Sequence, residues 1–201
     1  DDDDPPAPAG NGGGGGGGGT TTITASTVES VTYSLDGTVH TYTAGANNVE
    51  VVFSNSGSSG VPISTKIYGC GFYNSVTEES YMDFDLGQFQ MNGFGIPDED
   101  EFFGWFGTGA VPYGNTDSEL EKAEVSMNDG PPLYTEWSSR CGAQTGATFN
   151  ITQIVEIPNS IQYDRVKYRV TFNCKLYNCS GGGAVRTITN GVAVVLCENN
   201  I

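Results

Sequence analysis

The stretch with the most chemical potential is a run of acids that leads directly into aromatic side chains, at residues 96–107. Asp98 and Asp100 are its candidate metal ligands, because Ca²⁺ prefers roughly six to eight oxygen ligands. Four consecutive acids at 98–101 cannot all face one ion, however, and the DxDxDG spacing of a calcium loop is missing. We therefore expect a solvated acidic loop and no cofactor, with Ca²⁺ as the alternative.

The aromatic residues of this stretch have two expected roles. Most of them are expected in the hydrophobic core, since aromatic side chains bury a large apolar surface. A tryptophan in a glycine-rich loop can instead stack on a sugar ring or on a protein partner. Trp105 and Tyr113 are therefore the candidate contacts for a ligand or partner.

A pair of carboxylates suggests a second kind of chemistry. Asp83 and Asp85 share one face of an expected strand, and two carboxylates can act as acid and base in glycoside hydrolysis. This spacing is common on open strands, and the sequence has no GxSxG, HExxH, P-loop or dinucleotide-binding signature. The lone His40 has no serine or cysteine motif beside it. We expect no enzyme, and hydrolase is the third alternative after the two binding functions below.

The charge of the chain excludes other classes of function. The 201 residues carry a net charge of −16, which argues against nucleic-acid binding because phosphates are neutralised by clustered Lys and Arg. Residues 73–137 hold fourteen acids and one base, Lys122, whereas residues 138–201 are mildly basic. A single histidine excludes multi-histidine metal sites, and no run of about 18 apolar residues predicts a membrane-spanning helix.

The elements that must position these residues are β-strands. The clearest is at 165–177, where apolar and polar residues alternate strictly, which places one face in the core. Gly191 inside the last strand indicates a bulge, and residues 117–122 are a short helical candidate. The strands are expected at 31–34, 39–43, 49–53, 63–68, 80–86, 88–91, 102–106, 124–127, 133–137, 148–157, 165–177 and 185–197. This pattern predicts an all-β, antiparallel sandwich or flattened barrel of about ten strands.

The first 27 residues differ from the rest. Four aspartates are followed by a Pro/Ala segment and by eight glycines at 12–19, with almost nothing to bury. Such a segment cannot offset the entropy of ordering, so it behaves as a flexible coil. We expect a disordered tether over 1–27 and one β domain over 28–201.

The five cysteines indicate an oxidising compartment. Cys70, Cys141, Cys174, Cys179 and Cys197 have no metal-site spacing, so two disulfides and one leftover thiol are expected. The sequence leaves the pairing open, although Cys174 and Cys179 are close enough to link a strand end to its turn. Cys174 falls on the buried face of its strand, which makes it a poor candidate for thiol chemistry.

Several motifs carry a resemblance to a known group of proteins. An acidic run followed by a Gly-rich tether resembles the start of mature outer-membrane lipoproteins of Bacteroidota. The order of Tyr33–Thr38 with Asp36-Gly37, then Phe149–Thr152, then Ile188–Gly191 resembles a group of small uncharacterised β-rich lipoproteins of the same phylum. The resemblance implies a lipid anchor on a cysteine that precedes Asp1 and export to the cell surface; a secreted or periplasmic protein is the alternative. It implies no catalytic residue.

The leading functional expectation is a non-enzymatic surface lipoprotein. It would act in binding, or as an accessory subunit with outer-membrane protein partners, and would touch the membrane through its N-terminal lipid only. A carbohydrate-binding or adhesin-type module that uses Trp105 is the alternative, with a glycan as the ligand.

Overall fold

The computed structural model describes residues 21–58, 63–77, 80–93, 95–114, 122–131, 133–158 and 163–199. Eleven strands, one short helix and one 3₁₀ turn make up its regular structure. They are β1 (Ser30–Leu35), β2 (Thr38–Thr43), β3 (Val49–Ser58), β4 (Ile63–Asn74), β5 (Ser80–Asn92), α1 (Glu99–Gly104), β6 (Gly109–Ala110), β7 (Ala123–Asn128), β8 (Glu136–Ser138), η1 (Ser139–Cys141), β9 (Thr148–Ile157), β10 (Arg165–Asn178) and β11 (Val185–Glu198).

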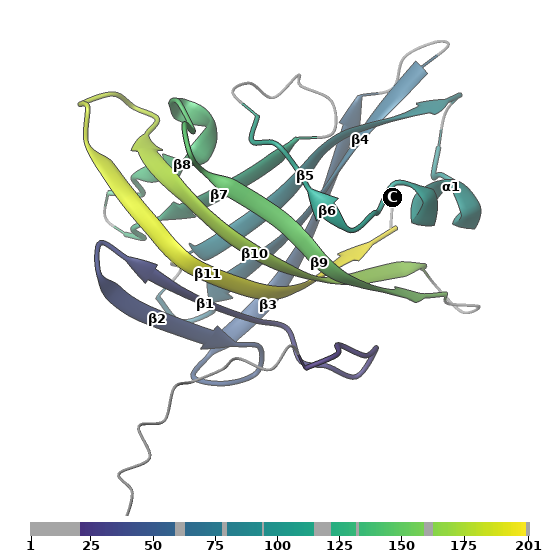
Figure 1. Cartoon of the computed structure of the whole chain (residues 1–201), viewed down its shortest axis with the longest axis horizontal. Coiled ribbons are helices and arrows are strands. Elements are labelled where there is room, and N and C mark those ends of the chain that lie inside the picture. Colours follow the sequence, from purple (N-terminus) through teal and green to yellow (C-terminus); the bar gives the residue numbers. More distant parts are fainter. Residues whose placement is uncertain are drawn as a thin grey trace, which may run out of the picture.

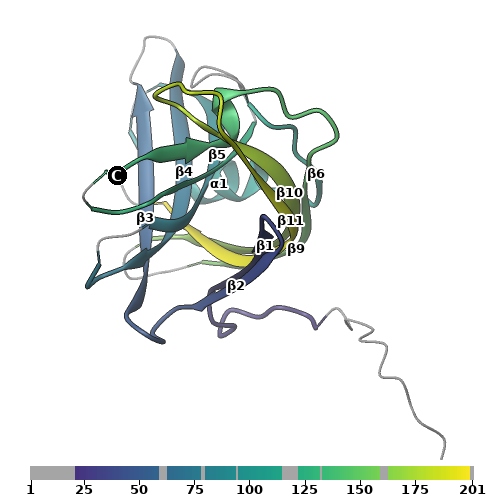
Figure 2. The same ribbon diagram turned by 90° about the vertical axis from the view of Figure 1, so that its left-hand side faces the viewer.

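All eleven strands belong to one antiparallel sheet that curls back on itself. Its order is β2-β1-β11-β10-β8-β7-β5-β4-β3, and β9 pairs with β10 while β6 pairs with β9. The strands β9, β10 and β11 cross over β3, β4 and β5, so that the single sheet forms two packed layers (Figure 1, Figure 2). The layers are continuous through β8, whose Ser138 is paired with Tyr177 near the end of β10. The predicted all-β antiparallel sandwich or flattened barrel is confirmed.

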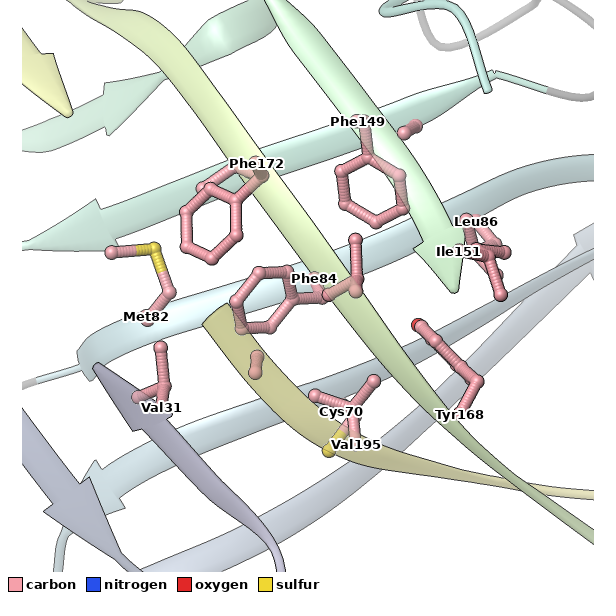
Figure 3. Close-up of a cluster of buried hydrophobic side chains, with 14 of the residues drawn as sticks. Val31, Cys70, Met82, Phe84, Leu86, Phe149, Ile151, Tyr168, Phe172 and Val195 are labelled. Carbon is pink, nitrogen blue, oxygen red and sulfur yellow. The ribbon is translucent and has the colours of Figure 1, made fainter. Parts of the chain in front are cut away.

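The core lies between the two layers and follows the period-2 pattern of the strands. In β10, Val166, Tyr168, Val170 and Phe172 point inward, as the alternation predicted. The ring of Phe84 in β5 lies across from Phe172, with 5.1 Å between the ring centroids in an edge-to-face arrangement (Figure 3). Aromatic pairs of this geometry join the layers and fix their separation.

Some expected elements differ from the sequence-based prediction. Residues 80–86 and 88–91 form one strand, β5, with an irregularity opposite Lys66 and Tyr68 in place of a turn. Of the segment 133–137, only the last two residues belong to β8, because Tyr134 has a positive φ of 44° and interrupts extended structure. Residues 117–121 of the helical candidate lie outside the described residues.

The expected strand at 102–106 is wrong: most of this segment belongs to α1. The Asp98 carboxylate caps the helix by accepting a hydrogen bond from the Glu101 amide at 2.8 Å. The acids of the first turn, Glu99 to Glu101, complement the positive end of the helix. Phe102 of this helix is fully buried, so its ring packs in the core.

The folded body begins earlier than residue 28. Ile23 is buried, and its amide donates to the Gln153 side chain at 2.8 Å. The Lys167 ammonium donates to the carbonyls of Ala25, at 2.8 Å, and Thr27, and pairs with Glu29 at 2.8 Å. The expected tether boundary at residue 27 is therefore too late, because residues 23–27 already contact the sheet. The rest of the expected tether, residues 1–20, lies outside the described residues.

The cysteines form one disulfide, between Cys141 and Cys179, which are 38 residues apart. The expected second disulfide and the suggested link between Cys174 and Cys179 are wrong, because Cys174 faces the core on β10. Cys70, Cys174 and Cys197 are free and buried. Burial raises the pKa of Cys70 and of Cys174 to about 12, which keeps both thiols protonated and unreactive.

Gly191 marks the bulge that the sequence predicted. Phe172 of β10 is paired with Gly191 but Cys174 is paired with Ile188, so β11 contains one extra residue here. Asn190, next to the glycine, has a positive φ of 52°. A Cβ atom on residue 191 would lie only 2.6 Å from the Phe172 ring, so the ring occupies the space that the glycine leaves.

We expect Gly191→Ala to lower the free energy of unfolding by about 1–3 kcal/mol, the usual result of overpacking a core. Urea unfolding of both proteins measures the difference. Gly104→Ala is the matched control, since a Cβ there meets no atom within 4 Å. Equal unfolding midpoints for Gly191→Ala and the wild type would contradict the close packing of Phe172 on this position.

Candidate functional site

A hollow of about 410 Å³ on the outer face of β3, β5 and β7 gathers the polar groups of the candidate site. Its chemically active side chains, which we call the polar cleft, are Ser54, Asp85, Lys122, Glu124 and Arg140. Carboxylates, cations and a hydroxyl therefore meet in one place. The cleft can both accept and donate hydrogen bonds to a ligand.

The two carboxylates come from neighbouring strands. Asp85 of β5 is directly paired with Glu124 of β7 in the register of the sheet. Directly opposed side chains have their Cβ atoms about 4.5–5.5 Å apart, so the two acids are held side by side. The alternation of β5 turns Asp85 outward, because its neighbour Phe84 points into the core, and Glu124 of β7 lies between the buried Ala123 and Val125.

Two glycines of β4 make room for the acids of β5. Gly69 is paired with Asp85, and Gly71 is paired with Asp83. A Cβ atom on residue 69 would lie 2.1 Å from Asp85 Oδ1, and one on residue 71 would lie 2.0 Å from Asp83 Oδ1. Both carboxylates therefore lie over the bare backbone of β4, and Asp85 lines the hollow.

Neighbouring groups hold Glu124 in place and shift the pKa of Asp85. Ser138 Oγ donates to Glu124 Oε1 at 2.6 Å, and Arg140 Nε lies 3.5 Å from the same oxygen. Burial raises the pKa of Asp85 to about 7, and the negative charges of Glu124 and Asp83 act in the same direction. The Ser54 hydroxyl and Arg140 oppose this rise without cancelling it. Asp85 therefore changes its charge near neutral pH.

An apolar pocket of about 190 Å³ adjoins the polar cleft. Gly87 and Lys122 line both hollows, and the Gly87 amide donates to the Lys122 carbonyl at 2.5 Å. The pocket lies between β5 on one side and β6 and β9 on the other, and its walls are lined by Leu86, Phe89, Trp105, Phe106, Val111 and Ile151. Residues 87 and 88 of β5 stand opposite the single Ile67 of β4, and this bulge bends β5 at Gly87.

The predicted contact residues Trp105 and Tyr113 occupy different places. The Trp105 ring stacks on Phe89, with centroids 5.1 Å apart, and lines the apolar pocket. Tyr113 lines a separate shallow hollow with Thr148 and Asn150. Its hydroxyl lies within hydrogen-bond distance of two carbonyls, Asn173 at 3.2 Å and Thr148 at 3.3 Å, and can donate to either, so it links β9 to β10. The role of either residue in ligand contact stays a prediction.

The predicted metal ligands Asp98 and Asp100 do not converge. Asp98 caps α1, and Asp100 is exposed on the first turn of that helix. Within the described ranges, no group of three or more Asp, Glu, His or Cys side chains is arranged to hold a metal ion. The described acids of this run therefore serve the helix start, and Ca²⁺ binding stays an untested alternative.

Sequence reasoning singled out Asp83 and Asp85 but missed their partners. Ser54, Lys122, Glu124 and Arg140 come from distant segments, and no local pattern marks them as a group. One signal was available: the glycines at 69 and 71 repeat with the same period of two as the two aspartates. Paired strands with matching small and acidic residues indicate carboxylates that lie on the backbone of a neighbour.

No protein-family model matches the chain, and neither a curated protein nor a solved structure matches it. In the part of the chain that the structure describes, every helix is too short or too polar to cross a bilayer. Geometry and chemistry are thus the grounds for assigning the polar cleft.

Proposed function

We propose that this protein is a non-enzymatic, cell-surface binding module that takes a carbohydrate in the polar cleft. The observation that carries the proposal is the polar hollow of about 410 Å³, where the carboxylates of Asp85 and Glu124 lie close to cationic side chains, with Trp105 lining a neighbouring pocket. Sugar hydroxyls both donate and accept hydrogen bonds, and the cleft offers carboxylate acceptors beside Lys122 and Arg140 as donors. Concave sites that combine few polar groups with aromatic walls are typical of small-ligand binding.

The contacts of Glu124 favour binding over hydrolysis. A glycosidase uses both of its carboxyl groups on the bond to be cleaved, one as acid and the other as base or nucleophile. Asp85 and Glu124 stand side by side on adjacent strands, and Glu124 is engaged by Ser138 and Arg140.

The proposed location is the cell surface, through a lipid on a cysteine before Asp1. The disulfide fits an oxidising, extracytoplasmic compartment. An outer-membrane protein partner stays a prediction.

We expect Asp85→Asn to weaken glycan binding at pH 8 at least tenfold, because a hydrogen bond to a charged group contributes about 1.5–3 kcal/mol. A glycan array identifies the ligand, and isothermal titration measures its affinity. Glu50→Gln, which removes one charge from an exposed position of β3, is the matched control and should bind like the wild type. Equal affinity in Asp85→Asn and the wild type would contradict a binding role for the cleft. Release of reducing sugar from the bound glycan would contradict the non-enzymatic assignment.

A further inference from the structure

The balance of charge in the polar cleft decides which class of sugar it suits. Two acids, Asp85 and Glu124, and two bases, Lys122 and Arg140, line the hollow. The guanidinium of Arg140 also compensates an acid outside the lining, since its Nη2 lies 3.0 Å from Glu136 Oε1 and its Nε lies 3.5 Å from Glu124 Oε1. One positive charge is thus divided between two carboxylates, and the negative charge at the cleft exceeds the positive charge.

A third acid on the same face of β5 increases this excess. Asp83 lies two residues before Asp85, and the carboxylates of both lie over glycines of β4. Burial raises the pKa of the Asp85 carboxyl, and the negative charges of Glu124 and Asp83 add to the rise. With Asp83 and Glu136 added to the lining, four acids stand against two bases. A field of this sign attracts a cation and repels an anion.

The two acids of the lining are placed so that one cation can contact both. Asp85 and Glu124 are directly paired on β5 and β7, which puts their Cβ atoms about 4.5–5.5 Å apart. An ammonium group has three N–H donors on one nitrogen, so it can donate to two carboxylates and to one further oxygen. The hydroxyl of Ser54 offers that oxygen, since it lies 3.5 Å from Asp85 Oδ1. A ligand amine at this position would offset the repulsion between the acids.

We propose that the ligand is an amino sugar, whose protonated amine binds to Asp85 and Glu124 while its hydroxyls bind to the rest of the polar cleft. This inference rests on the proposed carbohydrate-binding function and names the class of sugar. Lys122 is the donor that the sugar hydroxyls would meet in the same hollow. A neutral sugar would leave the excess of negative charge in place, and a sugar acid would add to it.

The test compares sugars that differ in the group on a single ring carbon. A glycan array carries β-1,4-linked tetrasaccharides of glucose and of galactose, each with a hydroxyl, an amine or an N-acetyl group at C2, together with sugar acids of the same length. Isothermal titration at pH 7 then measures the affinities within the best-bound set. We expect the full chain to bind the amine member at least tenfold more tightly than the other members, about the effect of one charge-assisted hydrogen bond. Salt at about 0.5 M should reduce this preference at least about threefold, because it screens the attraction between partly exposed charges.

Two variants of the lining should change the preference in opposite directions. Asp85→Asn keeps the shape of the side chain and removes its charge, so the amine member should lose most of its advantage. Lys122→Gln removes a positive charge that opposes a bound amine, so the advantage should grow about threefold. Glu50→Gln removes one charge from an exposed position of β3, and this matched control should keep the wild-type preference. A purely structural role of either lining residue would change the affinity for all members equally.

The outcomes separate this inference from the proposed function. Equal binding of all members, or tighter binding of a hydroxyl, N-acetyl or acidic member, would overturn the amino-sugar assignment and leave the carbohydrate function standing. An unchanged preference in Asp85→Asn would do the same. Binding of no sugar on the array would overturn the carbohydrate function, and the amino-sugar assignment with it. Thermal unfolding shows whether each variant is folded; if neither is, the wild type decides, since a preference that salt does not change contradicts an ammonium–carboxylate contact.

Discussion

Joint replacement of Cys141 and Cys179 by serine is expected to lower the free energy of unfolding by about 4 kcal/mol. The disulfide closes a loop of 38 residues, and the entropy that a cross-link of this length removes from the unfolded chain corresponds to about that value. The loop contains β9 and β10, which pair with each other. Loss of the disulfide therefore loosens the point where the two layers of the sheet join through β8 and β10.

Guanidinium unfolding of the double variant and the wild type measures this difference. The wild type unfolded in a reducing agent is the control, and it should match the double variant. Because Arg140 directly precedes Cys141, we also expect weaker ligand binding once the disulfide no longer holds this turn. A difference of less than about 1 kcal/mol would contradict the entropic account of this cross-link.

The sheet was predictable wherever strands alternate strictly between apolar and polar residues. The bounds of β9 were predicted to the residue, and those of β10 and β11 within one residue, because their inward positions bear a continuous row of apolar side chains. The bulge at Gly191 was predicted from a glycine inside such a pattern. The alternating pattern therefore predicts both the strand and its bulge.

The segment 102–106, which was predicted as a strand and belongs mostly to α1, carries two conflicting sequence signals. Four aromatic residues within 102–106 favour a strand by propensity, yet Asp98 followed three residues later by Glu101 is a helix start. The cap decided the outcome, because it satisfies an amide that a strand would have left to a neighbour. Trp105 consequently faces the apolar pocket from the end of a helix and not from a strand or an open loop.

The candidate site could be predicted only in part. The spacing of Asp83 and Asp85 places both on one face of β5, which needs no knowledge of the fold. The partnership of Asp85 with Glu124 depends on which strand lies beside β5 and on its register, and both are long-range properties. Arg140 enters the cleft through η1, whose position depends on the disulfide. The local sequence pattern therefore predicts individual residues of the site, whereas the cleft as a whole depends on how distant strands pair.

The pH dependence of stability is expected to reveal Asp85 as a destabilising group above neutral pH. Its pKa rises from the ordinary 3.8 to about 7 in the folded protein, chiefly because of burial, with Glu124 and Asp83 adding to the effect. A raised pKa means that the folded state binds this proton more tightly than the unfolded state. The contribution of Asp85 to the free energy of unfolding is therefore most favourable below about pH 4, declines between about pH 4 and 7, and is constant above that range.

The substitution Asp85→Asn removes this decline without changing the shape of the side chain. A shift of about three pKa units corresponds to about 4 kcal/mol, so the variant should be more stable than the wild type by up to about that amount at pH 8. Near pH 4 the two proteins should agree within about 1 kcal/mol, because both side chains are then uncharged. Urea unfolding at several pH values between 4 and 8.5 measures the difference, and Glu50→Gln should follow the wild type throughout.

A variant less stable than the wild type at pH 8 would contradict the buried, mutually repelling arrangement of these acids. The expected gain in stability has the opposite sign to the expected loss of glycan affinity in the same variant. A carboxylate that lowers stability is retained where its charge is needed by a ligand, which is the usual conflict between stability and function at a binding site. If Asp85→Asn raises stability at pH 8 and weakens glycan binding together, one buried charge accounts for both effects, and the polar cleft is the place where the fold gives up stability for recognition.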